Sequence, residues 1–320
     1  RFLLNNVFNV DQLFASMPDT AEVTDDLIVA IVEEAGKIAE GLLAPINQSG
    51  DAEACHFDNG IVTTPEGFKE AYKEFAEGGW SSLTGDVDYG GQGMPKMLSA
   101  VIEEMLFAAN SSFALYTILN TGATLTLSHH GSDELKQRYL PKMYSGNWSG
   151  TMCLTEPHAG TDLGMIKTKA ELQADGSYRL SGTKIFITAG EHDLTENIIH
   201  LVLAKLPDAP EGPRGISLFL VPKFLVDESG MLTGERNTVA CGSIEHKMGI
   251  KASSTCVMNF DSAAGYLVGE ENQGLSHMFT MMNYERLSMG LQGNGLADSS
   301  YQLASAYAKE RVQGRAETGA

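Results

Sequence analysis

The chain has 320 residues, of which 43% are hydrophobic and 20% are charged, and its net charge is −19. These are globular values, and the length predicts two or three domains, since one domain usually has about 100–200 residues. The acidic charge and the lack of any run of Lys or Arg argue against nucleic acid as a partner, because a phosphate backbone would be repelled.

Helices are predicted over the first 147 residues. Apolar residues recur at helical spacing from Leu27 to Leu42, with Thr24 as a candidate N-cap and Pro45 at the end of the segment. A second helix is expected to open at Thr64-Pro65-Glu66, with Pro in the first helical position, and to close at Gly78-Gly79.

Three more helices are expected before the pattern changes. Residues 95–110 form one, and residues 112–130 form a mostly apolar one that should be buried. Another is predicted to begin after the N-cap Ser132 and to stop near Pro141.

Short β-rich runs follow, over about residues 149–261. The run 167–188 alternates and carries Asp175-Gly176 at its centre, which is typical of a hairpin. The repeated spacing of the later runs predicts a small barrel or sandwich. The helical pattern resumes near residue 274 as one long helix and the start of another. So short a block cannot cover its own apolar face, and we expect the chain to be part of a longer protein.

These elements predict an α+β protein with three domains. The first is an N-terminal all-α domain over residues 1–147, the second a central β domain over 148–264, and the third the beginning of a C-terminal helical bundle over 265–320. Four scattered cysteines without a C-x-x-C pair fit neither a disulfide framework nor a zinc site, and indicate reduced thiols in an intracellular protein. No uninterrupted apolar run approaches the ~20 residues that span a bilayer, so no membrane span is expected.

Two local patterns suggest ligand sites that the surrounding sequence does not support. His129-His130 followed by Glu134 has no third metal ligand nearby, and we expect a helix-terminal histidine pair and no metal. The stretch Gly290–Gly295 reads G-x-x-G-x-G inside a helical segment, whereas a dinucleotide fingerprint reads G-x-G-x-x-G after a strand.

The stretch "MCLTEPHAGTD", residues 152–162, carries the densest polar chemistry. Cys153 as a nucleophile would need a base and an orienting group. A metal site would need Glu156, His158 and Asp162 to converge across a turn. In a third interpretation, a strand ends in a loop whose backbone N–H groups face a polar ligand, together with the hydroxyls of Thr155 and Thr161. The residues alone do not separate this interpretation from a plain structural turn.

The same stretch resembles the first signature of the acyl-CoA dehydrogenase family. The matching positions are Cys153, Leu154, Thr155, Glu156, Ala159, Gly160, Thr161 and Asp162, and Met165 departs from the small residue at the signature's edge. Four more stretches resemble family motifs in the same order: "YGGQG" at 89–93, "HGSDELKQRYLPKMYSG" at 130–146, "GTKIFITAG" at 182–190 and "EHKMGIKASST" at 245–255. The resemblance covers nearly the whole chain.

The resemblance implies FAD bound between the central β domain and the C-terminal helices. The signature loop would bind the flavin pyrimidine edge, and an aromatic–Ile–Thr triplet would cover the ring. The positions that match these contacts are Met152, Cys153, Leu154, Thr155, Ala159, Gly160, Thr161, Phe186, Ile187 and Thr188. Arg311 matches an arginine that reaches the FAD pyrophosphate of a neighbouring subunit, although Gly314-Arg315 replaces the family's Phe-Gly.

The implied reaction is α,β-dehydrogenation of an acyl-CoA thioester, with a carboxylate taking the α-proton and a β-hydride passing to flavin N5. Glu285 occupies a position that serves as the base in some members, while most members carry the base in a segment that would lie beyond Ala320. Thr161, Asn283 and Arg286 match substrate contacts.

Family members usually pass electrons to an electron-transferring flavoprotein and form homodimers or homotetramers. The N-terminal stretch resembles the larger-subunit branch that includes 3-methylmercaptopropionyl-CoA dehydrogenases. The expected location is the bacterial cytoplasm, or the mitochondrial matrix in a eukaryote. Alternative functions are an acyl-CoA oxidase that uses oxygen, a non-dehydrogenating flavoprotein on the same fold, and a hydrolase that uses Cys153.

Overall fold

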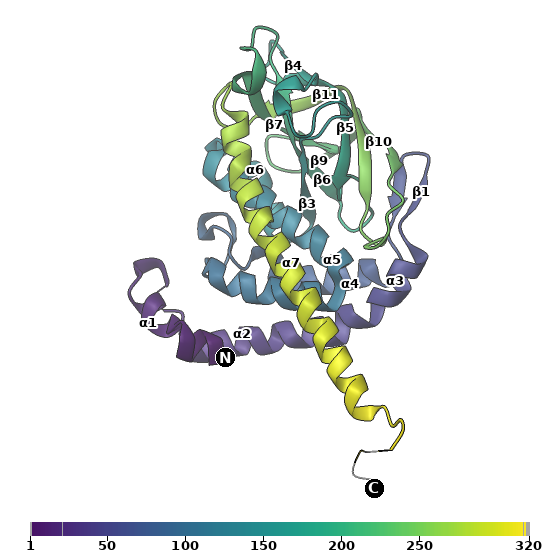
Figure 1. Cartoon of the computed structure of the whole chain (residues 1–320). Helices are drawn as coiled ribbons and strands as arrows, with labels where there is room; N and C mark the ends of the chain where they lie inside the picture. Colours follow the sequence, from purple (N-terminus) through teal and green to yellow (C-terminus); the bar gives the residue numbers. More distant parts are fainter. Residues whose placement is uncertain (1, 21, 316, 318–320) are drawn as a thin grey trace.

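The computed structural model describes residues 2–20, 22–315 and 317. A helical part and a β part lie one above the other, and the long helix α7 (Gly274–Glu310) runs across both (Figure 1). The helices of the first part are α1 (Val10–Ala15), α2 (Asp25–Lys37), α3 (Asn47–Glu53), α4 (Phe68–Glu77), α5 (Lys96–His130) and α6 (Asp133–Tyr144). A small hairpin of β1 (His56–Asp58) and β2 (Ile61–Thr63) lies between α3 and α4.

Two of the predicted helix starts are confirmed by their caps. The Thr24 hydroxyl accepts a hydrogen bond from the backbone N–H of Leu27 at 3.3 Å, and the Ser132 hydroxyl accepts one from Leu135 at 3.3 Å. Each cap satisfies one of the amide groups that the first helical turn leaves without a partner.

Two predictions at prolines were wrong. Pro65 lies in a turn before α4, because Gly67 with a φ of +85° ends that turn and the helix begins only at Phe68. Pro141 does not stop α6, which continues to Tyr144. Packing of Leu140 and Met143 into the core outweighs the one hydrogen bond that the proline removes.

Residues 95–130 form one continuous element, α5, with a sharp kink at Asn110, which has a non-helical φ of −156° and ψ of 90°. The Asn110 side chain accepts a hydrogen bond from the Phe113 N–H and donates one to the Leu43 carbonyl. The two predicted helices therefore exist as two halves joined at this residue. By length and composition α5 resembles a membrane-spanning helix, but 61% of its most apolar window is buried inside the protein, as in a core helix.

The β part is a small closed barrel, as predicted. The strands β11 (Thr255–Leu267), β5 (Tyr178–Thr188), β4 (Lys169–Leu172), β6 (Asn197–Lys205) and β7 (Ile216–Pro222) pair in that order, and β7 pairs again with β11. The strand β3 (Trp148–Cys153) extends the sheet in parallel beside β6, and β10 (Val239–Ile244) extends it beside β11. The strands β8 (Phe224–Val226) and β9 (Leu232–Arg236) pair with each other as a separate antiparallel hairpin. The predicted turn at Asp175-Gly176 connects β4 to β5.

The α+β class is confirmed, whereas the division at residues 147 and 264 stays a prediction. The last block is a single helix and not a helix plus the start of another, because α7 continues through Gly290, Gly293 and Gly295 to Glu310. Its first half packs along α5 and against the barrel (Figure 1). This packing brings the helical part and the barrel together at one place.

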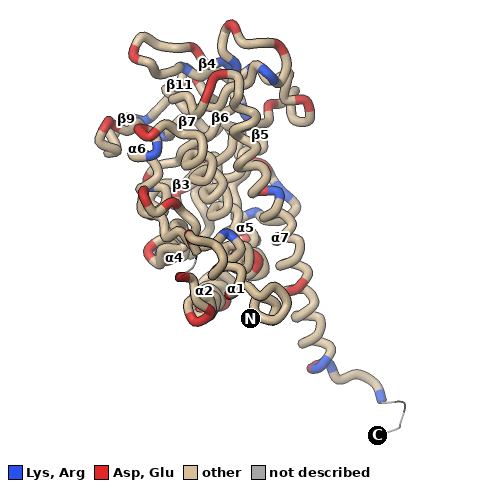
Figure 2. The backbone as a smooth tube through the Cα atoms, turned by 90° about the vertical axis from the view of Figure 1, so that its left-hand side faces the viewer, with Lys and Arg blue, Asp and Glu red and all other residues tan. Residues whose placement is uncertain are grey.

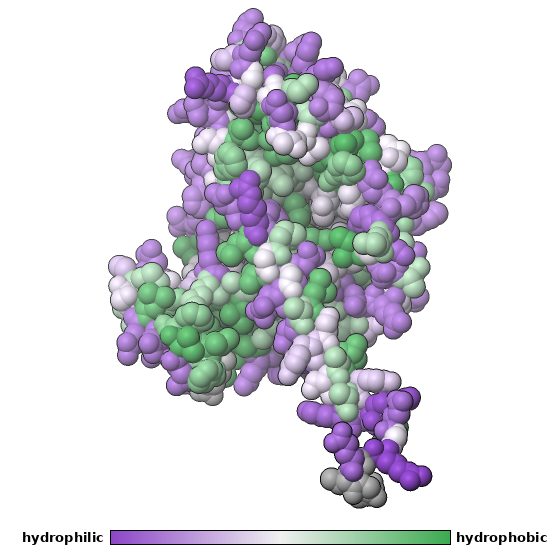
Figure 3. Space-filling view, viewed as in Figure 1, coloured by the Kyte–Doolittle hydropathy of each residue, from purple (hydrophilic) through white to green (hydrophobic). Residues whose placement is uncertain are grey.

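The surface carries dispersed charge. Figure 2 shows Lys and Arg separated from one another among Asp and Glu, without a basic stripe in that view. Apolar side chains gather over the N-terminal segment near α1 (Figure 3), where Phe2, Leu3 and Phe8 are more than half exposed. The large buried side chains belong mainly to α5, α6 and the inner face of the barrel.

Candidate active site

The signature loop is held from behind by a buried carboxylate. Glu156 and Ala159 exchange two backbone hydrogen bonds, at 2.9 and 3.0 Å, which close a tight turn after β3. The Glu156 carboxylate accepts hydrogen bonds from the Lys167 and Thr168 N–H groups and from the Thr168 hydroxyl, and forms an ion pair with Lys184 at 2.9 Å. Burial acts to raise the pKa of Glu156, but Lys184 and these donors lower it overall.

Lys184 joins the loop to strand β5. Its ammonium group, which is fully buried, also donates to the Leu154 carbonyl at 3.1 Å. This lysine was not predicted from the sequence, in which its only signal was a charged residue within an otherwise alternating strand. Glu156 and Lys184 therefore shape the loop and are not free for chemistry.

The opposite side of the loop is open. Gly160 and Thr161 are exposed and Thr155 is half-buried. Within the described part of the chain, the hydroxyls of Thr155 and Thr161 have no hydrogen-bond partner. The loop thus offers the polar groups that the third interpretation of this stretch required.

The predicted triplet lies beside this loop. The Ile185 N–H donates to the Thr155 carbonyl at 2.9 Å, and the Thr151 hydroxyl donates to the Thr188 carbonyl at 2.6 Å. Phe186 has a φ of +59° and is 59% exposed, while Ile187 is buried beneath it. A bulky residue in the left-handed region is strained, and such strain often occurs where a ligand is held.

Cys153 is not placed to act as a nucleophile. Its thiol is completely buried, and burial raises its pKa well above the ordinary value, so that the thiolate is disfavoured. His158 is exposed and its ring lies 3.1 Å from the Met165 carbonyl. The metal interpretation has no support either: among the described residues, no group of three or more His, Cys, Asp and Glu could hold an ion.

The histidine pair at the end of α5 contacts α7. His130 shares a hydrogen bond of 2.8 Å with the Thr280 hydroxyl and stacks on His277, with ring centroids 4.4 Å apart. The pair therefore helps to join α5 and α7, in line with the expectation of a helix-terminal pair.

Two predicted substrate residues lie together on the exposed face of α7. Arg286 donates to the Asn283 side chain at 2.9 Å, and its guanidinium lies 5.5 Å from the centre of the Phe279 ring. Arg311 follows the last turn of α7, at the far end from the barrel (Figure 1). Within one chain it does not join the other predicted site residues.

Glu285 is buried between α5 and α7, with only 8% of its surface exposed. Among the residues that the structure describes, its Oε1 atom has no hydrogen-bond partner, and a Cβ added to Gly122 would lie only 2.6 Å from that oxygen. Burial, with a smaller effect from nearby Glu103, raises the pKa of Glu285 to about 8. A partnerless buried carboxyl group with such a pKa is a candidate general base.

Glu103 is a second buried carboxylate that the sequence analysis missed. It accepts hydrogen bonds from the Tyr284 hydroxyl at 2.5 Å and from the Ser288 hydroxyl at 2.7 Å. Burial raises its pKa, and these donors act in the opposite direction. The available signal was a carboxylate at a core-facing position of the helix "VIEEMLF".

The raised pKa of Glu285 predicts a pH dependence of stability. Between about pH 4.5 and 8 the folded chain keeps a proton on this group that the unfolded chain releases. Its contribution to the free energy of unfolding is complete below that window and decreases as pH rises, by up to about 1.4 kcal/mol per pH unit. Urea denaturation of wild type and Glu285→Gln across this range tests the effect. We expect the variant to gain stability relative to wild type with rising pH, and a constant difference would contradict the assignment.

Comparisons with known proteins support the same family. Residues 28–147 match the family model "Acyl-CoA dehydrogenase, N-terminal domain", and residues 151–263 match "Acyl-CoA dehydrogenase, middle domain". A 3-methylmercaptopropionyl-CoA dehydrogenase of Ruegeria pomeroyi is 50% identical over 299 residues, which cover 93% of this chain and 51% of that protein. The chain thus spans about half the length of such curated relatives.

Solved structures show the same architecture. Butyryl-CoA dehydrogenase from Megasphaera elsdenii superposes with a TM-score of 0.75 at 25% identity, covering 91% of this chain and 71% of that one. An acyl-CoA dehydrogenase complexed with FAD from Bacillus anthracis gives a TM-score of 0.75 at 27% identity, covering 91% of this chain and 45% of that one. With two family models matching most of the sequence and this fold, the chain belongs to the acyl-CoA dehydrogenase family.

Proposed function

We propose that the protein dehydrogenates an acyl-CoA thioester between its α and β carbons, with FAD as cofactor and Glu285 as the base that takes the α-proton. The observation that carries the proposal is the state of Glu285, a buried carboxyl group with an unpaired oxygen and a pKa of about 8. An α-proton is weakly acidic, and its removal needs a base with a raised pKa in a site from which water is excluded.

The signature loop and the triplet fit the polar edge and the face of a flavin. The hydroxyls of Thr155, Thr161 and Thr188 have no partners within the described part of the chain. Phe186 and Ile187 provide apolar surface beside them. We propose that the remaining loop residues Met152, Cys153, Leu154, Ala159 and Gly160 contribute through their backbone. When bound there, FAD would supply the acceptor for the β-hydride.

The exposed side chains of α7 suit the nucleotide end of CoA. Arg286 is held by Asn283 and by the face of Phe279, which leaves its other N–H groups for a phosphate or an adenine. Thr161 lies on the exposed side of the loop and is proposed to contact the CoA part of the substrate.

Three further properties are proposed from family membership. Electrons leave to an electron-transferring flavoprotein, and the working enzyme is a homodimer or homotetramer in the bacterial cytoplasm or the mitochondrial matrix. Arg311, at the far end of α7, would then reach the FAD of a neighbouring subunit. An acyl-CoA oxidase or a non-dehydrogenating flavoprotein remains the competing proposal.

Anaerobic titration of the FAD-loaded protein with acyl-CoAs of different chain lengths tests the function. We expect a yellow protein whose flavin absorbance is bleached by at least one acyl-CoA and not by free CoA. Rapid return of the colour with air in multiple turnovers would instead indicate an oxidase. A protein that cannot be loaded with FAD would contradict the proposal, and full activity in Cys153→Ala would exclude the hydrolase alternative.

A further inference from the structure

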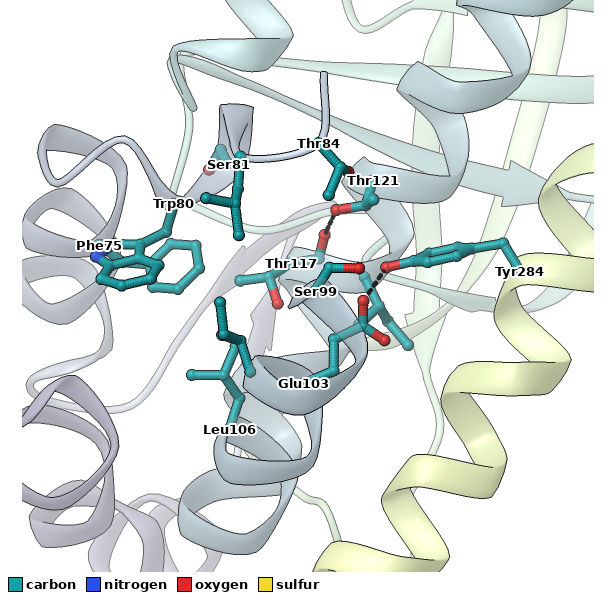
Figure 4. A pocket seen from close by; sticks show the side chains of 13 residues that line it. Phe75, Trp80, Ser81, Thr84, Ser99, Glu103, Leu106, Thr117, Thr121 and Tyr284 are labelled. Carbon is teal, nitrogen blue, oxygen red and sulfur yellow. Dashed lines mark hydrogen bonds between the residues drawn. The ribbon is translucent and has the colours of Figure 1, made fainter. Parts of the chain in front are cut away.

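A small cavity lies between α5, α7 and the short helix η5 (Trp80–Ser82) (Figure 4). Its volume of about 40 Å³ is enough for a few water molecules or for one small terminal group. Apolar side chains line one side: Phe75, Trp80, Leu83, Ile102, Leu106 and Ile118. A wider groove of about 240 Å³ shares Thr84, Ser99, Thr121 and Tyr284 with the cavity, so the two are continuous along their walls.

The part of this cavity near Glu103 presents hydrogen-bond acceptors, while Ser81 and Thr84 line its other end (Figure 4). Four hydroxyl groups near Glu103 direct their protons at carbonyl oxygens or at Glu103 itself. Ser99 donates to the Lys96 carbonyl at 2.9 Å, Thr117 to Ala114 at 2.8 Å, Thr121 to Thr117 at 3.1 Å, and Tyr284 to Glu103 at 2.5 Å. Lone pairs therefore face the space near Glu103, while the indole nitrogen of Trp80 points away from it (Figure 4).

The cavity adjoins the proposed base. Ser288, one turn after Glu285 on α7, donates to Glu103 at 2.7 Å. On α5, Thr121 lines the cavity, and the next residue, Gly122, faces the unpaired Oε1 atom of Glu285. A substrate whose α-carbon lies at Glu285 can therefore extend the rest of its acyl group toward Glu103.

We propose that this cavity is a subsite for the far end of the acyl group, and that it selects acyl groups ending in a hydrogen-bond donor, either a hydroxyl or an ammonium group. The proposal rests on the proposed dehydrogenase function and on Glu285 as the base. Glu103 is its specificity-determining residue, because a carboxylate has room for more acceptor bonds than those it receives from Tyr284, Ser288 and Ser99.

The selection has a simple physical basis. A substrate that ends in a methyl group displaces water from Glu103 and offers no hydrogen bond in return, which leaves a buried carboxylate partly unsatisfied. A terminal donor replaces the water. A site that hydrogen-bonds a substrate group discriminates strongly against analogues that lack it.

Equilibrium binding separates this effect from turnover. The FAD-loaded protein is titrated calorimetrically with 2-enoyl-CoA products of three chain lengths, each as a matched set that ends in a methyl, a hydroxyl or an ammonium group. At one of the three chain lengths, we expect the donor-ended enoyl-CoA to bind at least about 10-fold more tightly than the methyl-ended one, which is the gain typical of a hydrogen bond to a charged group. The ammonium and hydroxyl members show which donor the site prefers.

Two variants identify the origin of the preference. Glu103→Gln keeps the size of the side chain and one acceptor oxygen, for either Tyr284 or Ser288, while the other hydroxyl can turn to accept from the amide NH2. We expect it to reduce the preference to less than about 3-fold. Glu104→Gln removes the same charge from the next residue of α5, which does not line the cavity, and should leave the preference unchanged. A preference that survives in Glu103→Gln would overturn the assignment.

The results also distinguish this inference from the proposed function. If the wild-type protein binds all members of each matched set with equal affinity, the cavity holds only water. This result would contradict the inference but leave the proposed function intact. If no enoyl-CoA binds and no acyl-CoA bleaches the flavin, the proposed function fails and the inference with it.

Discussion

In the FAD-loaded protein, Glu285→Gln lowers the rate of flavin reduction by acyl-CoA by about 10³-fold, within the range that general bases contribute. The amide cannot take the α-proton, but it has nearly the same size and fills the same space beside Gly122. Acyl-CoA affinity should therefore stay within about 3-fold of wild type. Anaerobic stopped-flow absorbance of the flavin measures the rate, and its dependence on acyl-CoA concentration gives the affinity.

The pH profile provides a second test of this base. Because the base works only when deprotonated and its pKa is raised to about 8, the wild-type reduction rate should increase with pH up to that region and then level off. Glu104→Gln, a matched change on the neighbouring helix, should keep both the rate and the profile. Wild-type rates in Glu285→Gln would place the base in a segment outside this sequence.

Local signals were enough for most of the fold. Thr24 and Ser132 are caps that act within one helical turn, and Asp175-Gly176 forms a turn within a few residues, so their short-range pattern determines the result. The error at Pro65 arose from a competing local signal, the turn that ends at Gly67. The error at Pro141 arose from tertiary packing, which holds the last turn of α6 against the core.

The candidate site was visible only where the sequence carried a family motif. The roles of the loop and the triplet stay predictions, and the hydrogen bond from the Ile185 N–H to the Thr155 carbonyl shows only that the two segments are neighbours. Their support was not predictable, since Glu156 and Lys184 are 28 residues apart and meet only when the barrel has closed. Glu103 and Ser288 are 185 residues apart and meet only after α7 packs on α5.

Lys184→Met is expected to destabilise the protein by about 3–5 kcal/mol, because it leaves Glu156 buried without its cation. The carboxylate keeps three donors, from Lys167 and Thr168, but the Leu154 carbonyl loses its partner as well. Since both groups hold the signature loop, FAD should also bind more weakly. Urea denaturation measures the loss of stability, and flavin fluorescence titration measures FAD affinity.

The double variant Glu156→Gln with Lys184→Met distinguishes a lost ion pair from a poorly fitting side chain. Removing both charges eliminates the uncompensated carboxylate, so the double variant should be more stable than Lys184→Met alone. Lys37→Met, which breaks an exposed pair with Glu34 at the end of α2, should leave the denaturation midpoint almost unchanged, because water already solvates both charges. If Lys184→Met unfolds at the wild-type denaturant concentration, the pair does not support the loop, and the shape of the flavin site must then depend on the two backbone bonds between Glu156 and Ala159 and on the bonds that Lys167 and Thr168 donate to Glu156.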